Sequence, residues 1–309
     1  MKLIIICGAT ATGKSETAIA VAKELGAEII SADSMQLYKG MDIGTAKLHV
    51  ENREGIPHHM LDVLEVHEDA NVAWYQERAR AIISEIHARG KDVVVVGGTG
   101  LYIKAILDDL NFPDTDEAVR ESLNAMAEKI GPEAMFERLA TLDPAAALAI
   151  DKANLRRVIR ALEVIEITGK PFTANLPRKD STHFPHAKQF GLVMDRESLD
   201  VRISTRVNSM WDLGLVAETQ RLIEAGLRRG RTAQLALGYA QVIKFLDGLI
   251  SEADAIEETQ RTTRQYARRQ ETWFSRDERI DWISPAQPRV ETILSRLEKP
   301  VLPPQSPHE

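Results

Sequence analysis

The segment Gly8–Ser15, with the sequence GATATGKS, has a spacing that binds phosphate groups. It fits the pattern G-x4-G-K-[ST], follows an apolar run of strand length, and precedes apolar residues at helical spacing. The glycines let backbone N–H groups converge on phosphate oxygens, and the start of a helix adds partial positive charge. Lys14 adds a full charge, and the Ser15 hydroxyl can bind Mg²⁺. We therefore predict that a di- or triphosphate is bound by Gly8, Ala9, Thr10, Ala11, Thr12, Gly13, Lys14 and Ser15.

Asp33 is a candidate general base near this phosphate-binding loop (P-loop). An NTP hydrolase is expected to carry a carboxylate directly after its long apolar strand, but the strand expected at 93–96 is followed by Gly97–Gly100. Asp33 instead follows a strand expected at 28–32. Ligands of parallel sheets bind at the carboxyl ends of the strands, so Asp33 is placed to act there. A structural aspartate that caps a turn with Ser34 is the alternative.

Other polar segments give weaker signals. The loop 40–47 is rich in glycine and small polar residues, so it could close over a ligand or be a plain surface connection. The segment 97–102 offers backbone N–H groups and the Thr99 hydroxyl. His58 and His59 are adjacent on an extended segment and point to opposite faces, so we expect structural histidines and no metal site.

Two segments are basic although the chain is acidic on average, with 39 Lys and Arg against 46 Asp and Glu. An amphipathic helix is expected at 154–168 and a second helix at 252–275, where three aromatic residues accompany the arginines. Arginine planes with aromatic rings suit unpaired bases and phosphates. Solvated helix faces and core aromatics are the alternative. The residues are Arg156, Arg157 and Arg160 in the first helix, and Arg261, Arg264, Arg268, Tyr266, Trp273 and Phe274 in or beside the second stripe.

The order of the expected strands and helices predicts an α/β fold. It has a P-loop NTPase-like parallel sheet core, a helical insertion domain and a helical C-terminal part. Strands are expected at 3–7, 28–32, 93–96 and 190–194. Strands that alternate with helices indicate a parallel sheet with right-handed crossovers. We expect the core to span 1–111 and 189–285, the helical insertion 112–188, and an extended, disordered tail 286–309.

Composition narrows the class of protein further. A lone Cys7 cannot form an internal disulfide, and no apolar run approaches the roughly 20 residues of a membrane span. We therefore expect a soluble cytoplasmic protein with no membrane partner.

These pieces together resemble the bacterial tRNA dimethylallyltransferases, also called tRNA isopentenyltransferases. The resemblance covers about residues 3–283, and four positions depart from the usual pattern: Met35, Leu48, Gln241 and Ser275. The strings that carry it are GATATGKS (8–15), ISADSMQLYKGMDIGTAK (30–47), IPHHMLD (56–62), VGGTGLYIKA (96–105), RRVIRALEV (156–164), TGKP (168–171) and TRQYARRQETWF (263–274).

The resemblance implies transfer of a dimethylallyl group from dimethylallyl diphosphate to N6 of the adenosine immediately 3′ of the anticodon of tRNA. Asp33 and Thr10 would be catalytic, and Arg202 would join the P-loop and Mg²⁺ around the diphosphate. We expect a monomer that binds the anticodon stem-loop. The residues expected to contact tRNA are Asp33, Ser34, Met35, Gln36, Thr99, Arg120, Arg156, Arg157 and Arg160 by the resemblance, and Arg264 and Arg268 by their basic stripe.

Two other functions stay open at this point. An enzyme that prenylates free AMP, ADP or ATP would share the P-loop but would not require the helical insertion or the basic helices. An NTP-driven kinase or RNA-binding switch would also carry a P-loop, and the missing carboxylate after the strand at 93–96 argues against it.

Overall fold

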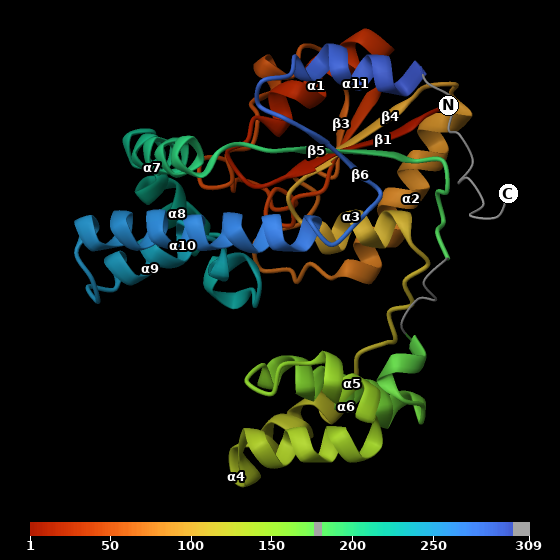
Figure 1. Ribbon diagram of the computed structural model, residues 1–309. Helices are drawn as coiled ribbons and strands as arrows, with labels where there is room; N and C mark the ends of the chain where they lie inside the picture. Colours follow the sequence, from red (N-terminus) through yellow and green to blue (C-terminus); the bar gives the residue numbers. More distant parts are fainter. Residues whose placement is uncertain (176–180, 299–309) are drawn as a thin grey trace, which may run out of the picture. The chain divides into compact units, whose positions relative to one another are not determined.

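A six-stranded parallel sheet forms the centre of the first of two compact units. The computed structural model describes residues 1–175 and 181–298, and the chain divides into 1–107 with the chain from Phe184 onward, and 108–183. The strand order is β3-β2-β4-β1-β5-β6, and every pairing is parallel (Figure 1). This confirms the predicted α/β class. The strands are β1 (Leu3–Gly8), β2 (Glu28–Ser31), β3 (His58–His59), β4 (Val93–Gly97), β5 (Lys188–Leu192) and β6 (Ile280–Ile283).

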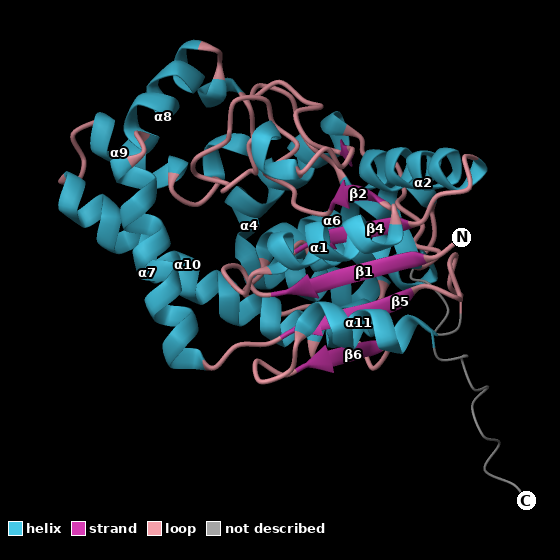
Figure 2. Cartoon of the chain, turned by 90° about the horizontal axis from the view of Figure 1, so that it is seen from above, coloured by secondary structure: helices cyan, strands magenta, loops and turns pink. Residues whose placement is uncertain are grey.

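Helices cover both faces of this sheet, which explains why its central strands are apolar throughout. Side chains alternate across β1: Ile4 and Ile6 pack with helices α1 (Lys14–Leu25) and α11 (Arg289–Glu298), which lie over the sheet in Figure 2. Ile5 faces the other side, where it packs with helices α2 (Val72–Ala88) and α3 (Gly100–Leu107). The strand β1 is therefore fixed on both faces, and the P-loop that follows it starts from a rigid position.

A group of helices continues the first unit beyond β5. Leu199, Ile203 and Val207 of α7 pack against Ala267 of α10, and Ala9 of the P-loop belongs to the same small core. The P-loop is thus attached to α7 and α10 by apolar contacts. These helices are α7 (Arg196–Asp212), α8 (Leu215–Glu224), α9 (Tyr239–Leu246) and α10 (Glu252–Phe274), with short 3₁₀ helices at Val50–Arg53, Leu227–Arg229 and Ala233–Leu235.

The second unit is helical and has its own apolar core. It contains α4 (Glu117–Leu142), α5 (Pro144–Ala149), α6 (Leu155–Thr168) and a 3₁₀ helix at Phe172–Asn175. Helix α4 is interrupted at Gly131, which has a φ of 83° and precedes Pro132. The Gly-Pro pair predicts this break. The side chains of α6 that face this core are buried and include Val158 and Leu162.

The expected extended tail is wrong for residues 289–298, which form helix α11. Val290, Ile293 and Leu297 lie on one face of this helix, and Ile293 and Leu297 are buried with α1. Three turns with this apolar spacing are enough to dock on a helix already in place, and the proline-rich sequence that follows masks the pattern. Residues 299–309 of the expected tail lie outside the described residues. No helix in the described part of the chain is long and apolar enough to cross a membrane.

Candidate active site at the carboxyl ends of the strands

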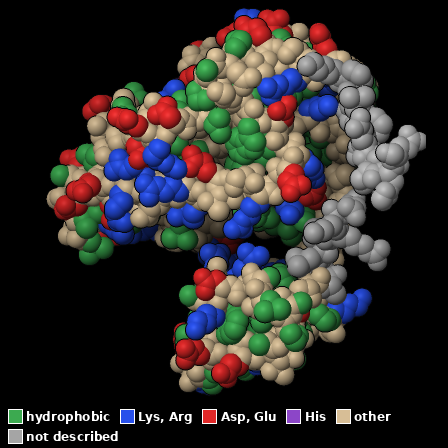
Figure 3. All heavy atoms as spheres, viewed as in Figure 1, with side chains coloured by type: hydrophobic (Ala, Val, Ile, Leu, Met, Phe, Trp, Pro, Cys, Tyr) green, Lys and Arg blue, Asp and Glu red, His purple; other side chains and the backbone are tan. Residues whose placement is uncertain are grey.

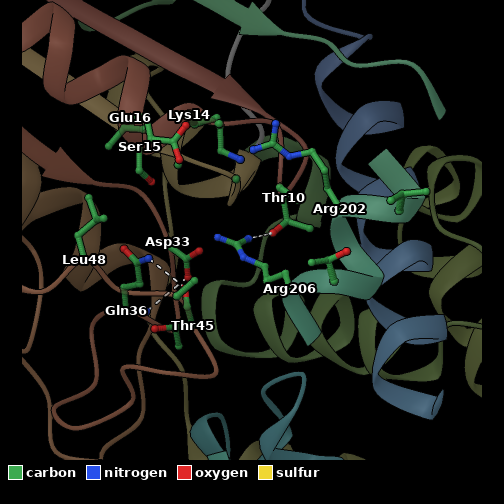
Figure 4. Close-up of a pocket in the computed structure, with 18 residues that line it drawn as sticks. Thr10, Lys14, Ser15, Glu16, Asp33, Gln36, Thr45, Leu48, Arg202 and Arg206 are labelled. Carbon is green, nitrogen blue, oxygen red and sulfur yellow. Dashed lines mark hydrogen bonds between the residues drawn. The ribbon is translucent and has the colours of Figure 1, made fainter. Parts of the chain in front are cut away.

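A cavity of about 420 Å³ lies where β1, β2 and β4 end. The P-loop follows β1, Asp33 follows β2, and Gly97 ends β4 with Gly98 directly after it. Helix α7 adds side chains from the opposite wall (Figure 4). The sequence places these segments far apart, and the parallel sheet brings their ends together. The polar residues that line the cavity are Thr10, Lys14, Ser15, Glu16, Asp33, Gln36, Thr45, Arg202, Thr205 and Arg206.

The P-loop backbone depends on glycine at two positions. Gly8 has a φ of 139°, and a Cβ atom there would lie 2.6 Å from the backbone oxygen of Leu192. Gly13 has a φ of 86° and precedes α1 as its N-cap. The hydroxyl of Thr12 donates to the backbone oxygen of Ala9 at 2.8 Å, which closes the curl. The loop is therefore curled around the start of α1, the geometry that favours an anion.

Lys14 is a half-buried cation without a carboxylate partner among the described residues. Its Nζ donates to the backbone oxygen of Ala9 at 2.5 Å. Burial, and next the positive charge of Arg206, lowers the pKa of Lys14 to about 8, although Asp33 partly offsets this. An anion that entered the cavity would relieve both effects.

Arg206 is a second cation of the cavity, and the sequence analysis missed it. Its Nη1 donates to Oγ1 of Thr10 at 3.0 Å (Figure 4), and burial lowers the pKa of Arg206. A guanidinium has no acceptor, so the hydroxyl proton of Thr10 stays available to another group. Arg202 lies one helical turn earlier and also lines the cavity. This i, i+4 spacing is the signal that could have added Arg206 to the predicted set.

Asp33 uses one carboxylate oxygen to stabilise the local turn, and its other oxygen is available to a substrate. Its Oδ1 accepts from the backbone nitrogen atoms of Met35 at 2.9 Å and Gln36 at 3.4 Å. The other oxygen, Oδ2, forms no hydrogen bond with any residue that the structure describes, and Asp33 lines the cavity. The turn-capping and general-base interpretations are thus compatible, since each uses a different oxygen.

The loop 40–47 lies at the cavity edge and is held by a buried carboxylate that sequence reasoning missed. Glu218 of α8 accepts from the backbone nitrogen of Ile43 at 3.0 Å and from the hydroxyl of Tyr239 at 2.6 Å. Gln36 donates to the backbone oxygen of Thr45 at 3.2 Å. This loop is therefore a fixed wall of the cavity, and Thr45 lines it. Only the tertiary structure pairs it with Glu218.

The other predicted residues of the first unit lie beside Asp33 or on helix α10. Oγ1 of Thr99 accepts from the backbone nitrogen of Ser34 at 3.1 Å, beside Asp33. Arg264 donates to Oγ of Ser204 at 2.8 Å, so it joins α10 to α7. Arg268 belongs to an exposed groove of α10, a region where Lys and Arg side chains gather in Figure 3. The groove is lined by Arg268, Arg269, Thr272, Trp273 and Arg276.

In the helical unit, the predicted arginines divide into paired and unpaired side chains. Glu163 is fully buried, and its Oε2 lies 2.8 Å from Nη2 of Arg120 and 3.1 Å from Nη1 of Arg160. The guanidinium groups of Arg156 and Arg157 are exposed and form no ion pair within the described ranges. The arginines predicted to contact tRNA are therefore of two kinds: some stabilise the helical unit, and others face solvent.

His58 and His59 lie on the edge strand β3. Nε2 of His59 lies 2.8 Å from Oε2 of the buried Glu28. Burial opposes ionisation of Glu28, but hydrogen bonds from His59, Arg89 and Lys91 outweigh it and bring its pKa to about 2. The described residues contain no cluster of three or more His, Cys, Asp or Glu side chains that could hold a metal ion.

Comparison with known proteins identifies the family. The family model described as IPP transferase matches residues 36–277. A tRNA dimethylallyltransferase of Thermobifida fusca is 56% identical over 286 residues, which cover 91% of this chain and 89% of that protein. One from Salinispora tropica is 48% identical, with 96% of this chain and 92% of that protein covered.

Solved structures similar to this chain belong to the same family. The full-length tRNA isopentenylpyrophosphate transferase of Bacillus halodurans has a TM-score of 0.70 and 38% identity, and the match covers 96% of this chain and 95% of that chain. A eukaryotic dimethylallyltransferase acting on tRNA has a TM-score of 0.73 and 30% identity, with 88% and 69% covered. The chain therefore belongs to the IPP transferase family.

Proposed function

We propose that the chain transfers a dimethylallyl group from dimethylallyl diphosphate to N6 of the adenosine immediately 3′ of the anticodon in tRNA. The observation that carries the proposal is a single cavity lined by both the P-loop and Asp33. An anion site for the leaving group and a carboxylate for the acceptor amine are the two groups that this reaction needs. The relatives from T. fusca and S. tropica are tRNA dimethylallyltransferases, a name that describes transfer of a dimethylallyl group to tRNA.

The diphosphate of the donor would bind in the P-loop. Lys14, Arg202 and Arg206 line this part of the cavity and have no ion-pair partner among the described residues. Backbone N–H groups of the curled loop and the start of α1 add donors for phosphate oxygens. These cations stabilise negative charge as it develops on the departing diphosphate.

The site fits Mg²⁺ bound mainly through the substrate. Ser15 lines the cavity, and its hydroxyl forms no hydrogen bond with the described part of the chain. Mg²⁺ usually takes few protein ligands and several oxygens from phosphate and water. When bound, the ion would neutralise part of the diphosphate charge, with Ser15 as its protein ligand.

The acceptor amine would face Asp33. The lone pair of N6 is delocalised into the adenine ring, so the amine is a poor nucleophile. In the transfer, N6 bonds to the allylic carbon, the carbon–oxygen bond breaks, and its electron pair leaves with diphosphate. Oδ2 of Asp33 accepts the N6 proton, and the hydroxyl proton of Thr10 is available to the leaving oxygen.

Exposed arginines of both units would bind the tRNA backbone. Arg156 and Arg157 in the helical unit, and Arg268 on α10, carry charge that the described structure does not neutralise with an ion pair. A base in an anticodon loop needs little energy to leave its stack compared with a base in a duplex. We propose that a monomer of the chain binds the anticodon stem-loop in this way.

The test is incubation with labelled dimethylallyl diphosphate and either tRNA or free AMP, ADP and ATP. We expect label in tRNA, at the adenosine 3′ of the anticodon after nuclease digestion and mass analysis. A tRNA with guanosine at that position is the matched control and should stay unlabelled. Label in free nucleotides alone, or ATP turnover without transfer, would contradict the proposal.

A further inference from the structure

Gln270 of α10 joins two of the loops that form the cavity. This side chain is 5% exposed, and both ends of its amide are used. Its Oε1 accepts from the backbone nitrogen of Thr10 at 2.8 Å, and its Nε2 donates to the backbone oxygen of Gly98 at 2.9 Å. Thr10 lies in the loop after β1 and Gly98 in the loop after β4. One amide therefore fixes the distance between them.

The fit around this amide is tight. A Cβ atom at Gly98 would lie 2.1 Å from Nε2 of Gln270, so the approach requires glycine. A Cβ atom at Gly100 would lie 2.1 Å from Trp273, one turn further along α10. The helix is therefore packed directly on the backbone of the loop after β4.

The same helix face reaches the third loop. Tyr266, one turn before Gln270, lies near enough to Thr99 for their side chains to interact. Thr99 in turn accepts from the backbone nitrogen of Ser34, next to Asp33. The loops that carry Thr10, Gly98 and Asp33 are thus connected through one helix.

Gln270 does not line the cavity, yet it determines how Thr10 faces it. Because the N–H group of Thr10 donates to Gln270, it is already used and does not serve as a free donor of the loop. The Thr10 side chain is instead presented beside Arg206. A side chain must both accept and donate to satisfy Thr10 and Gly98 together, and an amide of this length does so.

We propose that Gln270 is a positioning residue for prenyl transfer, which sets the separation between the leaving group in the P-loop and the acceptor base at Asp33. This inference rests on the proposed function. Small displacements of reacting groups lower rates strongly, so loss of the bridge should act on kcat.

Gln270→Glu is the diagnostic change. The ionised carboxylate still accepts from Thr10 but opposes the carbonyl of Gly98, whereas the protonated form restores both bonds. Burial favours the protonated form, which brings the recovery into an accessible range of pH. We expect kcat to fall about 30-fold at pH 8, with KM for both substrates within about threefold. The ratio of variant to wild-type kcat should rise at least about fivefold between pH 8 and pH 6.

Gln265→Glu is the matched control, since Gln265 lies on the exposed face of the same helix and should leave kcat and its pH profile unchanged. Gln270→Met is similar in length and lacks both hydrogen bonds, so its kcat should be lowered by a similar factor at every pH. This variant tests the role of Gln270 if the glutamate variant is unfolded at pH 8. Thermal unfolding of each variant separates loss of fold from loss of position.

A wild-type kcat in both variants, or a Gln270→Glu loss that stays constant with pH, would overturn the positioning role. The wild-type protein is assayed first with tRNA and with free nucleotides. Label in free nucleotides would refute the proposed acceptor, and the same variants compared on that substrate would still decide the role of Gln270.

Discussion

Arginines occupy two different environments in this chain. In the first unit, Arg202 and Arg206 line a cavity without an ion-pair partner in the described residues. In the helical unit, Arg120 and Arg160 both pair with the fully buried Glu163. The unpaired set is arranged for an anion that arrives with the substrate. In the paired set, Arg120 joins α4 to α6 through Glu163, and Arg160 pairs with Glu163 within α6.

The physical consequences of the two arrangements are opposite. Burial lowers the pKa of Arg206 and, with the charge of Arg206, the pKa of Lys14, so these neighbouring positive charges destabilise each other. A buried carboxylate that is paired instead lowers the stability of the fold when its partners are removed. Substitutions in the first set should therefore affect catalysis, and substitutions in the second set should affect stability.

The largest expected effect is that of Arg206→Ala on the transfer rate. Loss of a donor beside the leaving group should lower single-turnover rates by about 10²–10³-fold. The free energy of unfolding should stay the same or rise, because a half-buried cation without an ion-pair partner in the described residues is removed. Rapid-quench transfer assays and urea unfolding measure the two quantities. A wild-type rate with lower stability would show that Arg206 belongs to the structural set.

Glu163→Gln should destabilise the helical unit by about 2–3 kcal/mol, since two arginines lose a charged hydrogen-bond acceptor but can partly rehydrate. Urea unfolding and hydrogen exchange over α4 and α6 measure this. Glu166→Gln is the matched control: Glu166 is exposed and lies 3.8 Å from Arg138, so less than about 0.5 kcal/mol is expected. Equal effects of the two changes would contradict the distinction.

The affinity for dimethylallyl diphosphate should fall as pH rises above 8. The pKa of Lys14 is lowered to about 8, so the cation that attracts the diphosphate is present below this pH and lost above it. The loss is about tenfold at pH 9 if only the protonated form binds. Calorimetric titration across pH measures it. Lys14→Arg should bind with little change between pH 7 and 9, and a wild-type affinity that does not vary with pH would count against the assignment.

The smallest effect concerns the exposed arginines. Arg156→Ala with Arg157→Ala should weaken tRNA binding several-fold and reduce the slope of log Kd against log salt by about 1.5, with stability unchanged. Filter binding at several salt concentrations measures the slope. Arg160→Ala is the informative comparison, since Arg160 pairs with Glu163 and its loss should also lower stability. An unchanged slope would place the tRNA elsewhere.

Residues that belong to local patterns were predictable from the sequence. The P-loop and Asp33 each follow an apolar strand, and a parallel sheet brings such positions to one edge. The turn at Gly131 and the start of α6 are likewise encoded in neighbouring residues.

Residues defined by tertiary contacts were not predictable in the same way. Glu218 and Gln270 act on backbone groups more than 170 residues away in sequence, and no spacing signals that. Glu163 is one of two acidic residues in a basic helix, and only its burial with Arg120 and Arg160 distinguishes these arginines from their exposed neighbours. Helix α11 depends on α1 for its docking surface, so its short apolar pattern carried little weight alone.

The most direct test is the single-turnover transfer rate of Asp33→Asn with tRNA and dimethylallyl diphosphate both bound. Asparagine keeps the oxygen that accepts from Met35 and Gln36, so the turn is preserved while the proton acceptor is lost. We predict a rate at least about a hundredfold lower, with the Kd of each substrate unchanged. Transfer at the wild-type rate would contradict the account, because the N6 proton would then leave by another route.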